Sequence, residues 1–343
     1  MVIRQEESRI RTSFPRARSF AALANIILCC SGSFVFSDVG QIGLNSELSK
    51  NAGRHRSRFV RIALDLSPLP VTRDERRRVF DRIEALAAHA QARALSPSVG
   101  ERLQAISRVL FVEEGFKGSL DVTESASLSI NEVLEKKAGT CLSLVILYLA
   151  VAKRAGLEVH AAATPVHLFV RYEGPDGVLN VETLEGGRFL DEETYRRRHR
   201  IDESSIDRGI FLRPLPDEAV LAHFLSNLGA LHSAAGLHRR AMRDFKKALK
   251  LYPDLVAAWY NRGLEQLNHG DFEEARSYLS RAIELHPLDA EAFNNRGLAN
   301  LRLGDRLAAE RDFQEALRLE PGQKEARRNL ELLRVGTGPE SEH

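Results

Sequence analysis

Three residues able to perform nucleophilic catalysis follow one another in the middle of this 343-residue chain: Cys141, His167 and Glu182. Cys141 stands directly before a largely apolar run, residues 142–155, which predicts a buried helix that Gly156 can end in the left-handed conformation. The unpaired N–H groups and the positive dipole end of such a helix stabilise a thiolate at its first turn. A small, buried, unreactive cysteine is the alternative that Cys141 alone leaves open.

A β-hairpin is predicted to bring the histidine and the glutamate together. The segments "HLFVRYE" and "GVLNVETL" have strand propensity and are joined by the turn "GPDG". Pairing of Glu173 with Val178 sets the register. His167 and Glu182 then lie diagonally on one face, with Cα atoms about 7–8 Å apart. Taken alone, His167 could be a strand histidine with a structural hydrogen bond, and Glu182 a solvated charge on a strand. Together with Cys141, the two residues offer a base and an orienting carboxylate for a nucleophile.

Further elements must surround this group. Apolar residues recur at helical spacing over residues 72–92 and 98–114, which predicts two helices before the cysteine. The segment "LEVHAAAT", residues 157–164, predicts one more strand after the central helix. Helices and short strands in this order indicate an α+β domain.

A repeat occupies the C-terminal part of the chain. Gly229, Gly263 and Gly297 are each 34 residues apart, and a second glycine, two alanines and a proline recur with the same period. This pattern resembles the tetratricopeptide repeat, with three units over residues 222–323. Residues 324–335 are predicted to form a capping helix, because the last repeat must cover its open face.

The region around the cysteine resembles the transglutaminase-like superfamily. The stretches "NEVLEKKAGTCLSLVILYLAVAKRAGL", "PVHLFVRY" and "NVETLEGGRFL" look like its bacterial subgroup, whose domain commonly precedes tetratricopeptide repeats. The resemblance implies a papain-like α+β fold, in which the cysteine opens a central helix packed on an antiparallel sheet. It implies that Cys141 is the nucleophile, His167 the general base and Glu182 the residue that orients the imidazole. Two features depart from the family: the third residue is usually Asp, and many members of the subgroup lack the cysteine.

These residues lead to two hypotheses of function. In the first, the chain is a cysteine-dependent amide hydrolase or acyl transferase: the thiolate attacks an amide carbonyl, His167 protonates the leaving amine, and a thioester forms. The N–H of Cys141 would stabilise the oxyanion, with Asn131 as a candidate for the second donor. In the second, the domain is catalytically idle and the molecule is an adaptor acting through its repeats.

No metal site or cofactor is expected, because the 11 histidines show no ligand spacing and no phosphate-binding motif occurs.

The groove of the repeats is expected to bind a protein or peptide. The candidate contacts lie on the first helices of the repeats. A clamp for a peptide carboxylate is not expected, because Ser226 and Glu291 stand where basic residues would be needed. The basic run "YRRRHR" reads as a solvated face. The four candidate contacts are Tyr260, Leu264, Asn268 and Arg302.

Charge and the N-terminal residues bear on partners and location. The net charge of +2 gives no reason to expect a nucleic-acid partner. Five arginines precede an apolar stretch of 11 residues, 20–30, which resembles a signal peptide. This stretch is shorter than the roughly 20 residues of a bilayer span, so no permanent membrane span is expected. Exported or periplasmic and cytoplasmic locations both stay open.

The expected fold class is an α+β papain/transglutaminase-like domain followed by an all-α solenoid. Five parts are expected along the chain: a leader (1–59), the transglutaminase-like domain (60–201), a linker (202–221), three repeats with their capping helix (222–335) and a disordered tail (336–343).

Overall fold

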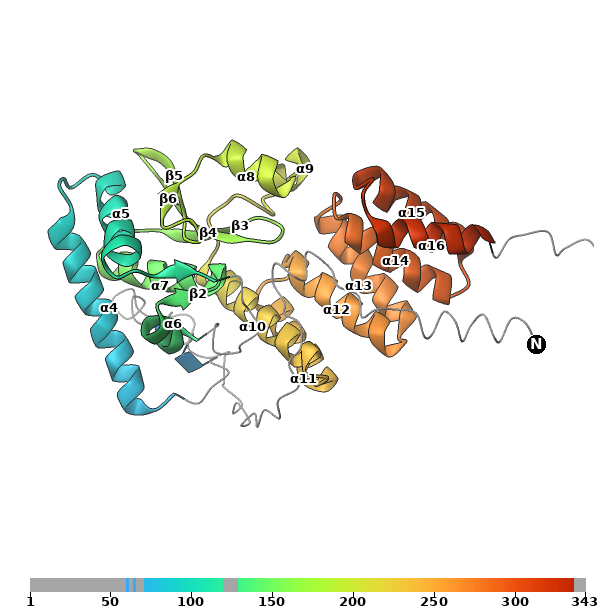
Figure 1. Cartoon of the computed structure of the whole chain (residues 1–343), viewed down its shortest axis with the longest axis horizontal. Helices are drawn as coiled ribbons and strands as arrows, with labels where there is room; N and C mark the ends of the chain where they lie inside the picture. Colours follow the sequence, from blue (N-terminus) through green and yellow to red (C-terminus); the bar gives the residue numbers. More distant parts are fainter. Residues whose placement is uncertain (1–59, 62–63, 66–70, 120–128, 336–343) are drawn as a thin grey trace, which may run out of the picture.

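The computed structural model describes residues 60–61, 64–65, 71–119 and 129–335 (Figure 1). An α+β domain is followed by a row of helix pairs that extends away from one side of it (Figure 1). The expected leader and tail lie outside the described residues, so the signal-peptide hypothesis stays a prediction. Among the helices of the described part, none has both the length and the apolar character needed to cross a bilayer.

The α+β domain begins with the two helical segments that the apolar spacing predicted. Helix α4 (Arg73–Arg93) starts at a capping box, in which Thr72 and Glu75 each accept the other's backbone N–H. Helix α5 (Val99–Ser107) continues as the π-helical segment η1 (Arg108–Glu113). One face of α4 is buried, and its buried residues are Val79, Ile83, Leu86, Ala87 and Ala90.

Helix α7 (Cys141–Arg154) forms the centre of this domain. Its first 12 residues are all buried, because helices α4, α5 and α6 (Ile130–Lys136) and strand β4 (Leu168–Gly174) pack around it. The chain enters α7 in close contact with the helix itself: a Cβ atom on Gly139 would lie 2.6 Å from the hydroxyl oxygen of Ser143. A larger residue at this entry would force the side chain of Ser143 to shift.

The sheet has the strand order β3–β4–β5–β6, with antiparallel neighbours. Glu173 pairs with Val178 across the hairpin, so the register predicted from the sequence is confirmed. This register puts Glu182 at the end of β5 and leaves His167 directly before β4. The strands are β3 (His160–Ala163), β5 (Gly177–Glu182) and β6 (Arg188–Phe189), together with the short parallel pair β1 (Lys117–Gly118) and β2 (Ala138–Gly139).

Residues 202–221, expected as a linker, are instead built into the core. They contain α9 (Glu203–Asp207) and the start of α10 (Asp217–Ala234), so the first repeat helix begins five residues before position 222. Leu215 forms an antiparallel bridge with Ala161 of β3. Buried apolar residues of this segment also pack in one cluster with residues of the sheet and of the repeats, which joins the two domains. Members of this cluster are Phe169, Ile210, Phe211, Leu212, Val256 and Leu285.

The repeats consist of three helix pairs and a capping helix. A Cβ atom on Gly229 would lie 2.7 Å from the ring of Phe245, and Gly263 and Gly297 approach the second helix of their own pairs as closely. The periodic glycines are therefore the points where paired helices cross. The pairs are α10 with α11 (His238–Leu251), α12 (Val256–His269) with α13 (Phe272–Leu285), and α14 (Ala290–Arg302) with α15 (Arg306–Leu319), and α16 (Lys324–Val335) packs on α15.

Candidate active site

Cys141 is the first residue of α7, and its side chain is almost fully buried, with 8% exposed. Thr140 caps the helix by accepting the backbone N–H of Ser143. The backbone N–H of Cys141 belongs to the first turn, where helices leave donors without an intrahelical partner. The imidazole of His167 and the backbone N–H of Leu168 lie next to the sulfur and act on its pKa. The helix start thus presents the sulfur to the histidine.

The imidazole of His167 lies between the sulfur and a carboxylate. Its Nε2 is 2.7 Å from Oε2 of Glu182, so Nδ1 is the nitrogen left to face Cys141. The loop that carries His167 is closed by Thr164, whose backbone N–H donates to the His167 carbonyl at 2.9 Å. The diagonal relation of His167 and Glu182 predicted from the hairpin is therefore present.

Glu182 is 3% exposed and fully hydrogen-bonded. Its Oε1 accepts the backbone N–H of Leu184 at 2.9 Å, and its Oε2 accepts the hydroxyl of Tyr195 at 3.1 Å in addition to the imidazole. Hydrogen bonds donated to a carboxylate favour its charged form. The three donors therefore hold Glu182 as an oriented anion behind the imidazole.

The three groups change one another's pKa values. Burial raises the pKa of the Cys141 thiol, but the hydrogen bond and charge of His167 and the N–H of Leu168 outweigh burial and bring this pKa below its ordinary value. Burial lowers the pKa of His167, yet its hydrogen bonds to Cys141 and Glu182 and their charges raise it to about 10. Burial raises the pKa of Glu182, and the contacts with His167 and the other donors reverse this effect. These shifts favour the charged forms of all three groups, a thiolate, an imidazolium and a carboxylate.

Helix α8 (Glu192–His199) supplies two neighbours of the site that the sequence analysis missed. Tyr195 is buried and donates to Glu182, and the ring of His199 stacks on that of His167 with centroids 5.7 Å apart. Burial, and then the charge of His167, lower the pKa of His199 to about 4, so His199 stays neutral beside the imidazolium. Both residues belong to "YRRRHR", and the prediction of a solvated face is wrong for the buried Tyr195 and the half-buried His199. Their spacing of four residues on one helix face was the available signal.

A cavity of about 280 Å³ lies between the α+β domain and the repeats. Its lining includes Pro165 and Val166, from the loop before His167, and also His199. The opposite wall comes from α12 and α14 and includes Tyr260, one of the predicted partner contacts. The cavity therefore places α12 and α14 of the repeats next to the loop that carries the histidine.

The other predicted contacts lie elsewhere. Leu264 is half-buried against the α12–α13 core, and Asn268 and Arg302 are exposed on α12 and α14. Tyr260 itself is only 4% exposed, and its hydroxyl donates to Glu291 and accepts a hydrogen bond from Asn295. Of the four residues, Tyr260 alone is among those that line the cavity.

The structure does not support Asn131 as the second oxyanion donor. Asn131 lies in α6, and its carboxamide oxygen accepts the hydroxyl of Ser129. It lines a separate cavity of about 260 Å³ against residues of α4 such as Glu75 and Arg82. The short helix α6 turns this side chain toward α4, an orientation that its position in the sequence did not reveal.

Known proteins match both parts of the chain. The family model described as "Transglutaminase-like superfamily" matches residues 77–226, and two tetratricopeptide-repeat models match residues 222–255 and 260–324. A UPF0162 protein of Xylella fastidiosa (strain 9a5c) is 32% identical over 186 residues, which are 52% of this chain and 66% of that protein. Protein SirB1 of Salmonella typhimurium is 30% identical over 118 residues, 34% of this chain and 44% of that protein. The matches thus span less than two thirds of either relative.

Among solved structures, the tetratricopeptide-repeat domain of Arabidopsis OM64 is 24% identical with a TM-score of 0.34, and the match covers 34% of this chain and 98% of that one. The family models cover the site residues on one side and the helix pairs on the other. The chain therefore contains a domain of the transglutaminase-like superfamily followed by tetratricopeptide repeats.

Proposed function

We propose that this protein is a cysteine-dependent amide hydrolase or acyl transferase that receives its protein substrate through the repeats. The observation that carries the proposal is the buried imidazole of His167 between the sulfur of Cys141 and the carboxylate of Glu182. Burying charged groups costs free energy, and apolar side chains could fill the same space without this cost. The three buried charged groups are therefore not explained by packing alone. Groups that strongly perturb one another's pKa values are concentrated at functional sites.

The proposed reaction starts from the thiolate–imidazolium pair. The sulfur of Cys141 attacks the amide carbonyl carbon, the C–S bond forms, and the carbonyl electrons move to the oxygen, near the backbone N–H at the start of α7. His167 then gives its proton to the leaving nitrogen as the C–N bond breaks, which yields an amine and a thioester. Neutral His167 accepts a proton from water or from an acceptor amine, which attacks the thioester and releases the thiolate. Turnover should therefore fall as pH rises through about 10, where His167 loses its proton.

The position of the cavity supports a polypeptide substrate. A segment held against Tyr260 on α12 would lie beside Pro165 and Val166, and so next to the loop of His167. Tetratricopeptide repeats commonly present extended grooves to protein partners. The repeats would then choose the substrate, while the α+β domain performs the chemistry.

The proposal is tested by the pH dependence of Cys141 alkylation. In a chain with Cys29→Ser and Cys30→Ser, iodoacetamide labelling of Cys141 is followed by intact-mass spectrometry between pH 5 and 10. Labelling should follow a midpoint below the ordinary thiol value of about 8.5. In His167→Ala the imidazolium is gone while burial remains, so the midpoint should move to about 8.5 or above.

His160→Ala is the matched control, because His160 is an exposed histidine on the neighbouring strand β3 and should leave the midpoint unchanged. Circular dichroism checks that each variant is folded. If the pH midpoint of Cys141 alkylation is the same with and without His167, the catalytic proposal is wrong. The adaptor, with an idle domain and repeats that bind partners, is then favoured.

A further inference from the structure

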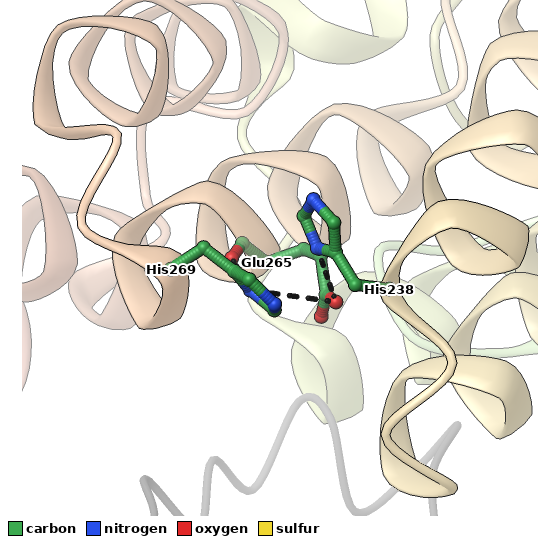
Figure 2. A group of neighbouring side chains, drawn as sticks. All are labelled: His238, Glu265 and His269. Atoms are coloured by element: carbon green, nitrogen blue, oxygen red, sulfur yellow. Dashed lines mark hydrogen bonds and ion pairs between the residues drawn. The ribbon is translucent and has the colours of Figure 1, made fainter.

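Three side chains with metal-ligand chemistry meet where the first and second repeats join. His238 is the first residue of α11, and Glu265 and His269 lie one turn apart on α12. Nδ1 of His238 is 2.9 Å from Oε1 of Glu265, and Nδ1 of His269 is 3.8 Å from the same oxygen. Figure 2 shows both imidazoles turned toward this one carboxylate. One ligand atom from each residue lies within 4.8 Å of the other two.

The repeat fold itself does not require these polar residues. The next repeat junction carries apolar side chains at the three positions that lie one period, 34 residues, further along the chain. A carboxylate as buried as that of Glu265, with 4% of its side chain exposed, costs free energy unless it is paired. The first junction therefore has polar side chains at positions where the second junction of the same chain has apolar ones. The equivalent residues, in the same order, are Phe272, Ala299 and Leu303.

The spacing of the three ligand atoms suits a small divalent cation. Zinc binds imidazole nitrogen and carboxylate oxygen at about 2.0–2.2 Å in tetrahedral geometry, so its ligand atoms lie about 3.3–3.5 Å apart. The two nitrogen–oxygen distances, 2.9 and 3.8 Å, lie on either side of this value. The two ring centroids are 3.5 Å apart, whereas two imidazoles on one tetrahedral ion have centroids about 5 Å apart, so the rings would separate on binding. His269, whose side chain is 45% exposed at the end of α12, has room to rotate into this geometry.

The surroundings also fit a metal site. The hydroxyl of Ser233 donates to Oε2 of Glu265, and an outer hydrogen bond of this kind orients a ligating carboxylate. Nδ1 of His269 also lies 3.1 Å from the backbone carbonyl of Glu265, a hydrogen bond whose proton an ion would displace. The side chains of His238 and His269 are 27% and 45% exposed, so solvent reaches the cluster and can supply the fourth ligand.

We propose that His238, Glu265 and His269 form a zinc-binding site that ties α11 to α12 at the junction of the first two repeats. The site is separate from Cys141 and does not depend on the proposed catalytic function. The spacing of histidines along the sequence did not reveal it, because only the packing of neighbouring repeats brings His238 to the other two.

The test uses the full chain with Cys29→Ser, Cys30→Ser and Cys141→Ala, so that no thiolate competes for the metal. Zinc binding is measured by isothermal titration calorimetry, and Co²⁺ absorption reports the ligand geometry. This chain should bind one Zn²⁺ through the cluster, and zinc should raise its melting temperature. Affinity should fall as the pH is lowered, because protons compete with the ion for the imidazole nitrogens.

The matched variant installs the residues of the second junction, as His238→Phe, Glu265→Ala and His269→Leu together. This variant should fold and lose the site. Ser233→Ala removes only a hydrogen bond to the ligand Glu265 and should weaken zinc binding by about 10- to 100-fold, so the triple variant should weaken binding by more than that. His160→Ala, on an exposed histidine of β3, should bind as the parent does. If the triple variant fails to fold, His269→Leu at the exposed helix end serves the same comparison. Unchanged affinity in these variants, or no saturable binding in the folded parent, would overturn the proposal.

Discussion

Two buried histidine–carboxylate pairs, one in each domain, have nearly the same geometry. His167 lies 2.7 Å from Glu182, with side chains 10% and 4% exposed. His232, on α10, lies 2.6 Å from Asp244 on α11, with side chains 10% and 8% exposed. Distance and burial therefore do not distinguish the pair of the candidate active site from the pair in the repeats.

The difference lies in what the other face of each pair meets. His167 also faces the sulfur of Cys141 at a helix start, and this contact contributes to raising the pKa of His167 to about 10. His232 joins the two helices of the first repeat. A buried histidine–carboxylate pair is thus a common structural solution, and the nucleophile beside it is what favours chemistry.

The third repeat supports this interpretation of the second pair. Two periods after His232 and Asp244, the same positions hold Asn300 and Asp312, and the amide of Asn300 donates to the carboxylate at 2.9 Å. Asp312 also binds Arg296. A hydrogen-bond donor of either type is therefore accepted at this position, as expected for a structural role.

The largest expected effect is on stability, in the repeats. His232→Ala leaves the buried carboxylate of Asp244 without this partner and should lower the free energy of unfolding by about 3 kcal/mol. His232→Asn, which copies the third repeat, should cost no more than about 1.5 kcal/mol. Urea denaturation measures both.

Neither variant at His232 should change the alkylation midpoint of Cys141. A midpoint that rose in the folded His232→Asn chain would show that the two pairs are coupled, and would contradict the separation drawn between them.

The next effect sharpens the role of the carboxylate beside His167. Glu182→Gln removes the negative charge that helps to hold the imidazolium. That charge by itself also raises the pKa of Cys141, but the loss of the imidazolium should dominate, so the alkylation midpoint of Cys141 should rise by about one pH unit. Glu182→Asp keeps the charge and should shift the midpoint less, and the shorter acid restores the residue that is usual in the superfamily. A glutamine variant that labels like the parent would mean that Glu182 only packs against the ring.

The smallest effect concerns Tyr195. Tyr195→Phe keeps the buried ring and removes the hydroxyl that donates to Glu182, so two donors still hold the carboxylate. Stability should fall by about 0.5–1.5 kcal/mol, and the Cys141 midpoint should move less than in Glu182→Gln. A larger shift for Tyr195→Phe than for Glu182→Gln would assign the main orienting role to the tyrosine.

The parts of this fold that were predictable have strong local or periodic signals. The "GPDG" turn and the alternation of the two strands were enough to predict the pairing of Glu173 with Val178, and with it the approach of His167 to Glu182. The 34-residue period predicted the helix pairs. Both signals are carried by residues near one another in the chain or by exact repetition of spacing.

The parts that were missed depend on tertiary packing. Tyr195 and His199 reach the site because α8 folds back over the sheet, and the surrounding arginines hid the pair. The segment 202–221 looked like a linker because of its prolines, although its apolar residues fill the core between the domains. Asn131 was a candidate by sequence position alone, and the orientation of α6 turns it away.

The most direct test of the account is the protonation state of His167. Its imidazole can be titrated by NMR in a chain labelled with ¹⁵N-histidine, with the signal assigned by its loss in His167→Ala. The thiolate–imidazolium pair predicts that both ring nitrogens stay protonated through neutral pH and that the ring titrates near 10. A ring that is neutral at pH 7, with an ordinary midpoint near about 6.5, would contradict the ion pair on which the proposed chemistry depends.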